Sequence, residues 1–163
     1  MLRRLVGAEI DFVLIGGVAV GAHGVIRGTQ DIDICPSPDP QNLERLAALL
    51  GELGAQQFGV ESSDFAADEM PYDPTRAGDL AGGGNFRLET PFGLLDLMQW
   101  IPGIDADQAY SELAADAVPA RAFGIEVPVS SLEKLRLMKR AAGRPQDLQD
   151  LEDLAAAHPE KPE

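Results

Sequence analysis

The sequence predicts an α+β fold, in which a β-sheet of about four to six strands is flanked by helices and followed by two C-terminal helices. Two observations support this prediction. Short apolar or alternating runs that stop at glycine or proline recur along the chain, as is typical of strands. Leucine and alanine recur between them at helical spacing. The chain of 163 residues is long enough for one domain whose core needs no disulfides.

The first half of the chain holds two predicted strands and three predicted helices. An apolar run and an alternating run predict strands over residues 12–15 and 31–35. The first run stops at Gly16-Gly17, which indicates a glycine turn before the next helix. Helices are expected over residues 18–23 and 41–53, with a short helix or lead-in over residues 1–9.

The second half adds three predicted strands and the two final helices. The strands are expected over residues 86–89, 94–98 and 126–129. Ser130 and Glu133 stand at capping-box spacing, so we expect a helix to open there and to end at Gly143. Pro145 takes the favoured first position of the last helix.

Two segments lack this regularity. Residues 59–84 are rich in acids and end in three glycines, which predicts a flexible surface region that could hold a hairpin. Residues 158–163 form a polar tail with two prolines. Because no linker divides the rest of the chain, residues 1–157 are predicted to form a single domain.

Composition excludes several classes of function. Acidic residues outnumber basic ones by 27 to 13, which gives a net charge of −14. We therefore expect neither a groove for extended duplex nucleic acid nor binding to an anionic membrane, although a short RNA end stays compatible. The single Cys35 allows no intrachain disulfide and fits a reducing, cytoplasmic compartment. One cysteine and two histidines, His23 and His158, make no zinc site.

Two carboxylates on one predicted strand are the first candidate functional residues. Asp31 and Asp33 are two residues apart, so on a strand both point to the same face. Their mutual repulsion needs compensation, which a hard divalent cation such as Mg²⁺ provides. The alternative is an amphipathic edge strand whose aspartates both lie in water. The preceding Gly16-Gly17 favours a phosphate-binding site, because glycines let the backbone approach a phosphate closely.

Asp96 is a third candidate carboxylate and lies within the apolar run 94–98. A charge in an apolar strand is costly unless it is paired or bound to a metal. The structural alternative is a single polar position on a strand with one wet face.

The stretch DFVLIGGVAVGAHGVIRGTQDIDIC resembles the nucleotidyltransferase superfamily that shares its fold with the palm of DNA polymerase β. More narrowly, it resembles the minimal and the abortive-infection or toxin-type members. Their pattern is Gly-Gly or Gly-Ser, then about a dozen residues, then Asp-x-Asp on a strand and a carboxylate on a later strand. The residues that match are Gly16, Gly17, Asp31, Asp33 and Asp96. The resemblance implies a mixed sheet and assigns the three aspartates to metal binding and catalysis.

Four further positions take nucleotide-binding roles from the same resemblance. Gly16 and Gly17 are implied to contact phosphates through their backbone, with Gly17 standing where many members have serine. Arg27 and Thr29 also fit the subfamily and are implied to lie in the nucleotide site.

Two charges on apolar helix stripes are candidates near the C-terminus. Lys139 follows Leu135 by four residues and so falls on a core-facing stripe. Asp147 precedes Leu151 by four residues and does the same. A Lys139–Asp147 ion pair, or a lysine stem along the core edge, would explain both structurally. The resemblance, which extends over residues 138–147, instead implies a catalytic, phosphate-binding lysine and an active-site acid.

The function implied by the resemblance is transfer of a nucleoside monophosphate from an NTP to an acceptor hydroxyl, with Mg²⁺ or alternatively Mn²⁺ as cofactor. The acceptor stays open among an RNA end such as that of tRNA, a protein hydroxyl and a small molecule. A toxin–antitoxin setting would add an antitoxin partner. Two alternatives use the same residues: a metal-dependent NTP hydrolase or nuclease, and a non-catalytic nucleotide-binding partner subunit.

Overall fold

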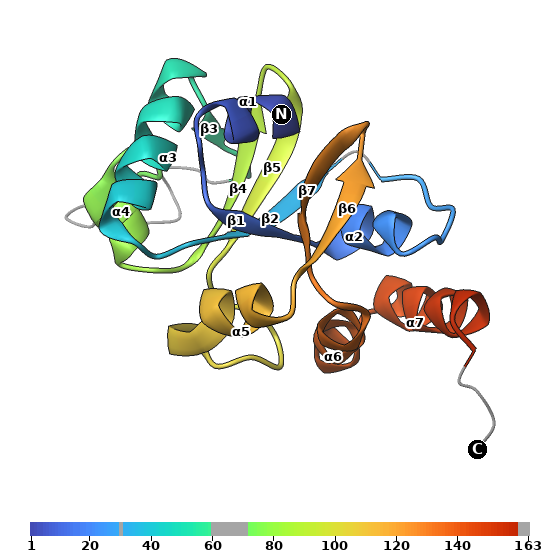
Figure 1. Cartoon of the computed structure of the whole chain (residues 1–163). Helices are drawn as coiled ribbons and strands as arrows, with labels where there is room; N and C mark the ends of the chain where they lie inside the picture. Colours follow the sequence, from blue (N-terminus) through green and yellow to red (C-terminus); the bar gives the residue numbers. More distant parts are fainter. Residues whose placement is uncertain (30, 60–71, 160–163) are drawn as a thin grey trace.

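A mixed β-sheet forms the centre of the computed structural model, which describes residues 1–29, 31–59 and 72–159. Within these residues the sheet has seven strands in the order β3-β4-β5-β2-β1-β7-β6 (Figure 1). The predicted α+β class and mixed sheet are confirmed, whereas the predicted number of about four to six strands is too low.

The central strands carry the predicted apolar runs. They are β1 (Phe12–Ile15), β2 (Ile32–Pro36) and β5 (Gly93–Met98). β2 pairs antiparallel with β1 and parallel with β5, and β1 pairs parallel with β7 (Ile125–Val129). All residues of β1 are buried, as expected for a strand covered on both faces.

The strands that the sequence pattern does not reveal lie at the two edges of the sheet. β3 (Gln56–Gln57) is short and polar, and β6 (Val118–Ala122) is mostly exposed. Neither has an apolar run or a clean alternation, so their partners define them: β4 (Asn85–Thr90) for β3, and β7 for β6.

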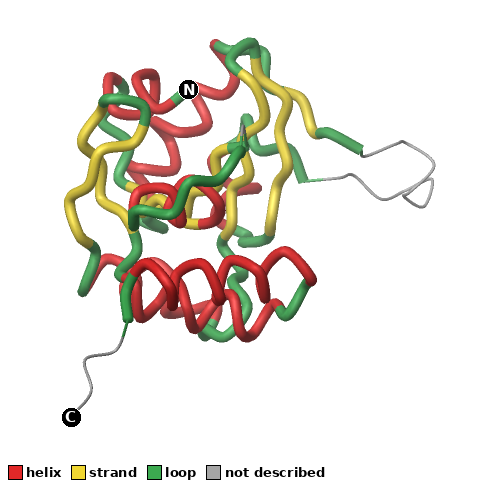
Figure 2. The backbone as a smooth tube through the Cα atoms, turned by 90° about the vertical axis from the view of Figure 1, so that its right-hand side faces the viewer, coloured by secondary structure: helices red, strands yellow, loops and turns green. Residues whose placement is uncertain are grey.

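Helices lie on both sides of the sheet (Figure 2). On one side α1 (Leu2–Gly7) and the short α4 (Ala77–Ala81) both contact α3 (Pro40–Glu52). Below the sheet in Figure 1 lie α5 (Ala109–Ala115), α6 (Leu132–Ala142) and α7 (Pro145–Ala157). A 3₁₀ turn, η2 (Ala106–Gln108), leads into α5, and α2 (Gly16–Ala22) directly follows β1.

The start of α2 corrects the predicted glycine turn. The helix begins at Gly16 rather than at Val18, so Gly16 and Gly17 are its first residues. Gly16 has a φ of +69°, a conformation that glycine adopts without strain, and the chain therefore turns from strand to helix at one residue. β2 likewise begins at Ile32, so Asp31 directly precedes the strand instead of opening it.

The cap of α6 also differs from the prediction. Ser131, and not Ser130, is the N-cap, because its Oγ accepts a hydrogen bond from the Lys134 amide at 3.1 Å. Ser130 continues the sheet instead, since its amide donates to the Leu14 carbonyl. Gly143 ends α6 in the left-handed conformation, as predicted.

The predicted irregular region is only partly described. Residues 60–71 of the predicted flexible region, which could hold a hairpin, lie outside the described residues, as does most of the tail, 160–163. The described remainder of 59–84 contains α4, an element that the sequence pattern did not predict. Its Asp79 carboxylate accepts a hydrogen bond from the Asp73 amide at 2.8 Å.

The core extends along the inner strands. Leu14, Ile34 and Leu97, from three neighbouring strands, are fully buried. Cys35 is buried and forms no disulfide, as a single cysteine requires. In the part of the chain that the structure describes, no helix is both long enough and apolar enough to cross a membrane.

Candidate active site

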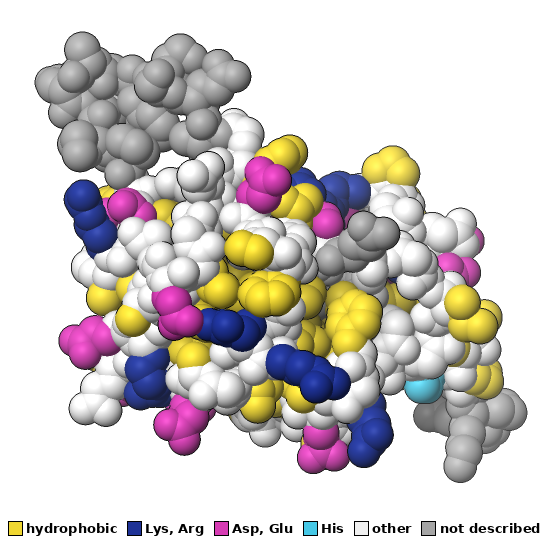
Figure 3. Space-filling view, turned by 90° about the horizontal axis from the view of Figure 1, so that it is seen from above, with side chains coloured by type: hydrophobic (Ala, Val, Ile, Leu, Met, Phe, Trp, Pro, Cys, Tyr) yellow, Lys and Arg dark blue, Asp and Glu magenta, His cyan; other side chains and the backbone are white. Residues whose placement is uncertain are grey.

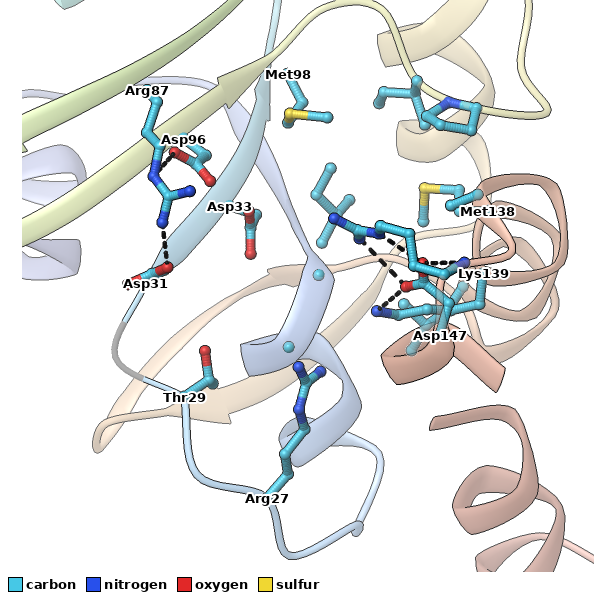
Figure 4. Close-up of a pocket in the computed structure, with 18 residues that line it drawn as sticks. Arg27, Thr29, Asp31, Asp33, Arg87, Asp96, Met98, Met138, Lys139 and Asp147 are labelled. Atoms are coloured by element: carbon cyan, nitrogen blue, oxygen red, sulfur yellow. Dashed lines mark hydrogen bonds and ion pairs between the residues drawn. The ribbon is translucent and has the colours of Figure 1, made fainter. Parts of the chain in front are cut away.

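All the residues singled out in the sequence line one cavity of about 460 Å³ between the sheet and α6–α7 (Figure 4). They are Gly16, Gly17, Arg27, Thr29, Asp31, Asp33, Asp96, Lys139 and Asp147. The fold therefore brings together residues that lie more than a hundred positions apart in the chain. Their individual roles stay predictions.

A row of charged side chains crosses three strands at this cavity. Asp33 of β2 is in register with Asp96 of β5, and Asp96 is in register with Arg87 of β4. Registered neighbours on adjacent strands point to the same face, so two carboxylates and one cation stand side by side. Asp31 lies beside this row, and its Oδ2 accepts a hydrogen bond from Arg87 Nη2 at 2.9 Å.

The two registered carboxylates are poorly neutralised. Burial, and then the neighbouring Asp96, raise the pKa of Asp33 to about 7, although Lys139 acts in the opposite direction. Burial also raises the pKa of Asp96, against the influence of Arg87. The Oδ1 atom of Asp96 is buried and accepts no hydrogen bond from the described residues. The site thus offers anionic oxygen with unused acceptor capacity.

This donor set fits a hard divalent cation. Carboxylate oxygens are the ligands that Mg²⁺ and Mn²⁺ prefer, and Asp96 Oδ1 has no hydrogen-bond donor among the residues that the structure describes. Within residues 1–29, 31–59 and 72–159, however, no three acidic, histidine or cysteine side chains already converge as a metal group. Arg87 bridges Asp31 and Asp96 instead. Binding a cation here would therefore require these side chains to rearrange.

Glycine at two positions brings the start of α2 against the charged groups. A Cβ added at Gly16 would overlap the carboxylate of Asp33. A Cβ added at Gly17 would lie 2.9 Å from Arg27 Nη1 and 3.1 Å from Thr29 Oγ1. The resemblance has serine at the second position in many relatives. Here the space of that side chain is taken by Arg27 and Thr29.

A buried ion network forms the opposite wall of the cavity. Lys139 Nζ lies 2.9 Å from Asp147 Oδ1 and 2.8 Å from Asp150 Oδ2. Asp150 also accepts a hydrogen bond from Arg27 Nη1 at 2.8 Å, which ties α7 to the segment before Asp31. Asp147 and Asp150 are almost completely buried, as is Lys139. The structural prediction of a Lys139–Asp147 ion pair is confirmed, and Asp150 is a further partner.

Arg144 completes this network at the surface. Its Nε donates to Asp147 Oδ2 at 2.7 Å, and its backbone amide donates to the same oxygen. Burial alone would raise the pKa of Asp147, but hydrogen bonds from Arg144 and Lys139 outweigh it and lower that pKa to about 2. Asp147 is therefore a permanent anion that holds two cations at the cavity.

Two charged residues of the site, Arg87 and Asp150, were not singled out in the sequence, and Arg144 was expected only as part of a basic cluster over residues 134–144. Arg87 gives no local signal, because its partner Asp96 is met only through strand pairing. Asp150 could have been found, since it follows Asp147 by three residues and so shares a helix face with it. Arg144 sits directly before the helix that Pro145 begins. The sequence also left unassigned an apolar wall of the cavity, made of Met98, Ile101, Pro102, Leu135, Met138 and Ala142.

Two other basic residues of α6, Lys134 and Arg136, make structural contacts. Lys134 Nζ lies 3.0 Å from Glu112, and Arg136 donates to backbone carbonyls at the end of α7. The face seen from above in Figure 3 lies across the sheet from α6, and there basic, acidic and apolar side chains are interspersed. His23 is structural as well, because its Nε2 hydrogen-bonds to the Ser130 carbonyl at 2.8 Å.

Solved structures share this architecture. The solution structure of the antibiotic-resistance factor ANT(2'')-Ia superposes with a TM-score of 0.56 and 19% identity, over 96% of this chain and 79% of that one. A crystal structure of ANT(2'')-Ia in complex with adenylyl-2''-tobramycin has a TM-score of 0.53 and 19% sequence identity, and the match covers 96% of this chain and 84% of that one. The lincomycin-bound lincosamide antibiotic adenylyltransferase LnuA has a TM-score of 0.57 and 17% identity, with 96% of this chain and 92% of that one covered.

The chain has a nucleotidyltransferase fold. This confirms the fold that the resemblance implied. At 17–19% identity the likeness concerns the fold alone, and the toxin-type subclass stays a prediction. No family model matches the chain, and no curated protein matches it either.

Proposed function

We propose that this protein transfers a nucleoside monophosphate from an NTP to the hydroxyl of an acceptor, with Mg²⁺ or Mn²⁺ as cofactor. The observation that carries the proposal is the registered pair Asp33–Asp96, which faces the buried Lys139 across one cavity. This arrangement suits a triphosphate: the carboxylates can hold the metal that the reaction needs, and the lysine can neutralise the charge of the leaving oxygens.

The carboxylates have two tasks in this proposal. Asp31, Asp33 and Asp96 would hold the cation, which when bound would stabilise the attacking and leaving oxygens of an in-line displacement. Asp96 would also accept the proton of the acceptor hydroxyl. The raised pKa of Asp96 supports this task, because it makes the carboxylate a stronger base than a free aspartate.

The cations would bind the phosphates. Lys139 carries three N–H donors, and its ion pairs with Asp147 and Asp150 hold it at the cavity wall. We propose that Lys139 neutralises the negative charge of the leaving pyrophosphate. Arg27 and Thr29 would contact the nucleotide beside Gly17, where no side chain separates them from the backbone of α2.

A small molecule is the acceptor class that we propose to test first. One fold neighbour is a lincosamide antibiotic adenylyltransferase, and another was solved with adenylyl-2''-tobramycin. The apolar wall around Met98 and Met138 offers a surface for an uncharged part of such an acceptor. An RNA end and a protein hydroxyl stay the alternatives. A toxin–antitoxin role and an antitoxin partner stay predictions, because the fold does not distinguish these settings.

The test uses each NTP labelled at the α-phosphate, Mg²⁺ and whole-cell lysate, separated afterwards into RNA, protein and small-molecule fractions. We expect label in one fraction with the wild type, and at least about a hundredfold less with Asp31→Ala or Asp33→Ala, whose folds stay intact by circular dichroism. Glu44→Gln, an exposed acid of α3, is the control and should transfer normally.

Other outcomes would assign the site differently. Release of free NMP without labelled product would favour the hydrolase alternative. Binding of Mg²⁺–NTP without turnover on any fraction would favour a nucleotide-binding subunit. Undiminished transfer by both aspartate variants would contradict the proposal directly.

A further inference from the structure

Arg87 occupies an unusual place among the residues of the cavity. Its Nη2 lies 2.9 Å from Asp31 Oδ2, and its Nε lies 3.7 Å from Asp96 Oδ1 (Figure 4). One guanidinium therefore bridges two of the three carboxylates that the proposed function assigns to the metal. The bridged Asp96 Oδ1 is the same atom that accepts no hydrogen bond from the described residues.

The pairing follows from the sheet. Arg87 stands directly opposite Asp96 in the antiparallel β4–β5 pair, and Asp96 stands beside Asp33 in the parallel β5–β2 pair. Opposite charges directly across a strand pair attract, whereas the two neighbouring carboxylates repel each other. Strand pairing thus places the Arg87 guanidinium at the edge of the carboxylate cluster of Asp31, Asp33 and Asp96.

The bridge is also easy to open. The Arg87 side chain is 48% exposed and Asp31 is 38% exposed, so water screens their attraction and competes for their hydrogen bonds. The Arg87 guanidinium also lies 5.6 Å from the ring centroid of Phe58, a second contact outside the carboxylate cluster. A divalent ion carries twice the charge of the guanidinium and is small enough to contact carboxylate oxygens directly.

We propose that the Arg87 guanidinium is the counter-cation of the Asp31 and Asp96 carboxylates when no divalent ion is bound, and that a divalent ion displaces it. The inference rests on the proposed function, because the same aspartates are assigned to the metal there. Two cations cannot share Asp31 Oδ2 and Asp96 Oδ1 without repulsion, so metal and Arg87 exclude each other.

The test measures metal binding without nucleotide or turnover. Mn²⁺ is titrated into wild type, Arg87→Gln and Arg87→Lys, and free Mn²⁺ is followed by electron paramagnetic resonance. We expect Arg87→Gln to bind Mn²⁺ about two- to fivefold more tightly, because a competing cation is removed. Arg87→Lys, which keeps the charge, should stay closer to the wild type. The control is Arg4→Gln, which removes the exposed Arg4–Glu52 pair far from the cluster and should leave affinity unchanged.

Thermal unfolding gives the second readout. Without metal, Arg87→Gln should melt below the wild type, since the carboxylates lose their counter-cation, and saturating Mn²⁺ should narrow that difference. If Arg87 only supported the fold, Arg87→Gln would bind Mn²⁺ more weakly than the wild type. Its Tm would then stay as far below the wild-type Tm with saturating Mn²⁺ as without it. Unchanged or weaker Mn²⁺ binding by the glutamine variant would overturn the inference and leave the metal site standing. Absence of Mn²⁺ binding by every variant and by the wild type would overturn both.

Discussion

At the scale of single residues, two missing side chains bring the backbone to the carboxylates. An added Cβ at Gly16 would overlap Asp33, and the φ of +69° there suits glycine. At Gly17 the neighbouring Arg27 and Thr29 take the space of a side chain. The Gly-Gly motif therefore has a steric reason that the sequence pattern alone did not contain.

We expect Gly16→Ala to lower the free energy of unfolding by about 2 kcal/mol and to weaken Mn²⁺ binding, because the new Cβ strains the backbone and displaces Asp33. Gly21→Ala is the matched control in the same helix, since nothing lies within 4 Å of its added Cβ. Alanine there should be neutral or stabilising by up to about 1 kcal/mol. Urea unfolding measures both variants, and equal effects would contradict the steric account.

At the scale of elements, two adjacent serines before α6 have different tasks. Ser131 Oγ accepts from the Lys134 amide and donates to Asp116 at 2.8 Å. Ser130 is fully buried, and its Oγ makes no hydrogen bond with the described residues. The cap thus lies one residue after the position that the capping-box spacing predicts.

Ser131→Ala should therefore cost about 1 kcal/mol of stability, the usual cost of losing an N-cap. Ser130→Ala should change stability by less than about 0.5 kcal/mol, because the Ser130 hydroxyl makes no hydrogen bond with the described residues that the substitution could remove. Chemical denaturation of the two variants distinguishes the assignments. A larger loss for Ser130→Ala would restore the cap to Ser130.

The same contrast explains which elements could be predicted. β1, β2, β4, β5 and β7 have their apolar runs or alternation in the sequence, and α6 and α7 have glycine or proline at their ends. β3 and β6 exist only because partner strands offer hydrogen bonds to chain segments without a pattern of their own. Single-sequence periodicity cannot contain that information.

At the scale of the whole molecule, the ion network joins the C-terminal helix to the site. Lys139 of α6 and Arg27 of the loop before β2 both pair with Asp150 of α7, and Asp147 holds Lys139 and Arg144. The stripe positions of Lys139 and Asp147 allowed an ion pair as one of two structural explanations, and the structure shows that pair. Asp150 shares a helix face with Asp147 and could have been found from its spacing, whereas the bridge from Arg87 to the aspartates follows from strand pairing.

This network predicts how the free energy of unfolding depends on pH. The pKa of Asp147 is lowered from 3.8 to about 2, so its contribution is present above pH 3.8 and is lost as pH falls through 2. Asp147→Asn should lower the free energy of unfolding by about 2 kcal/mol at pH 7 and flatten the loss between pH 4 and 2. Asp153→Asn, which loses only an exposed contact on the same helix, is the control. An identical stability deficit at pH 7 and pH 2 would contradict this account.

The central claim is nucleotidyl transfer at the Asp33–Asp96 pair, and one measurement with two labels tests it most directly. The wild type, Asp33→Ala and Glu44→Gln are incubated with Mg²⁺, the acceptor fraction and an NTP labelled distinguishably at its α- and γ-phosphates. The account predicts that the α label enters the acceptor and the γ label leaves as pyrophosphate, with wild type and Glu44→Gln only. An α label that ends in free NMP, or transfer that persists in Asp33→Ala, would contradict it.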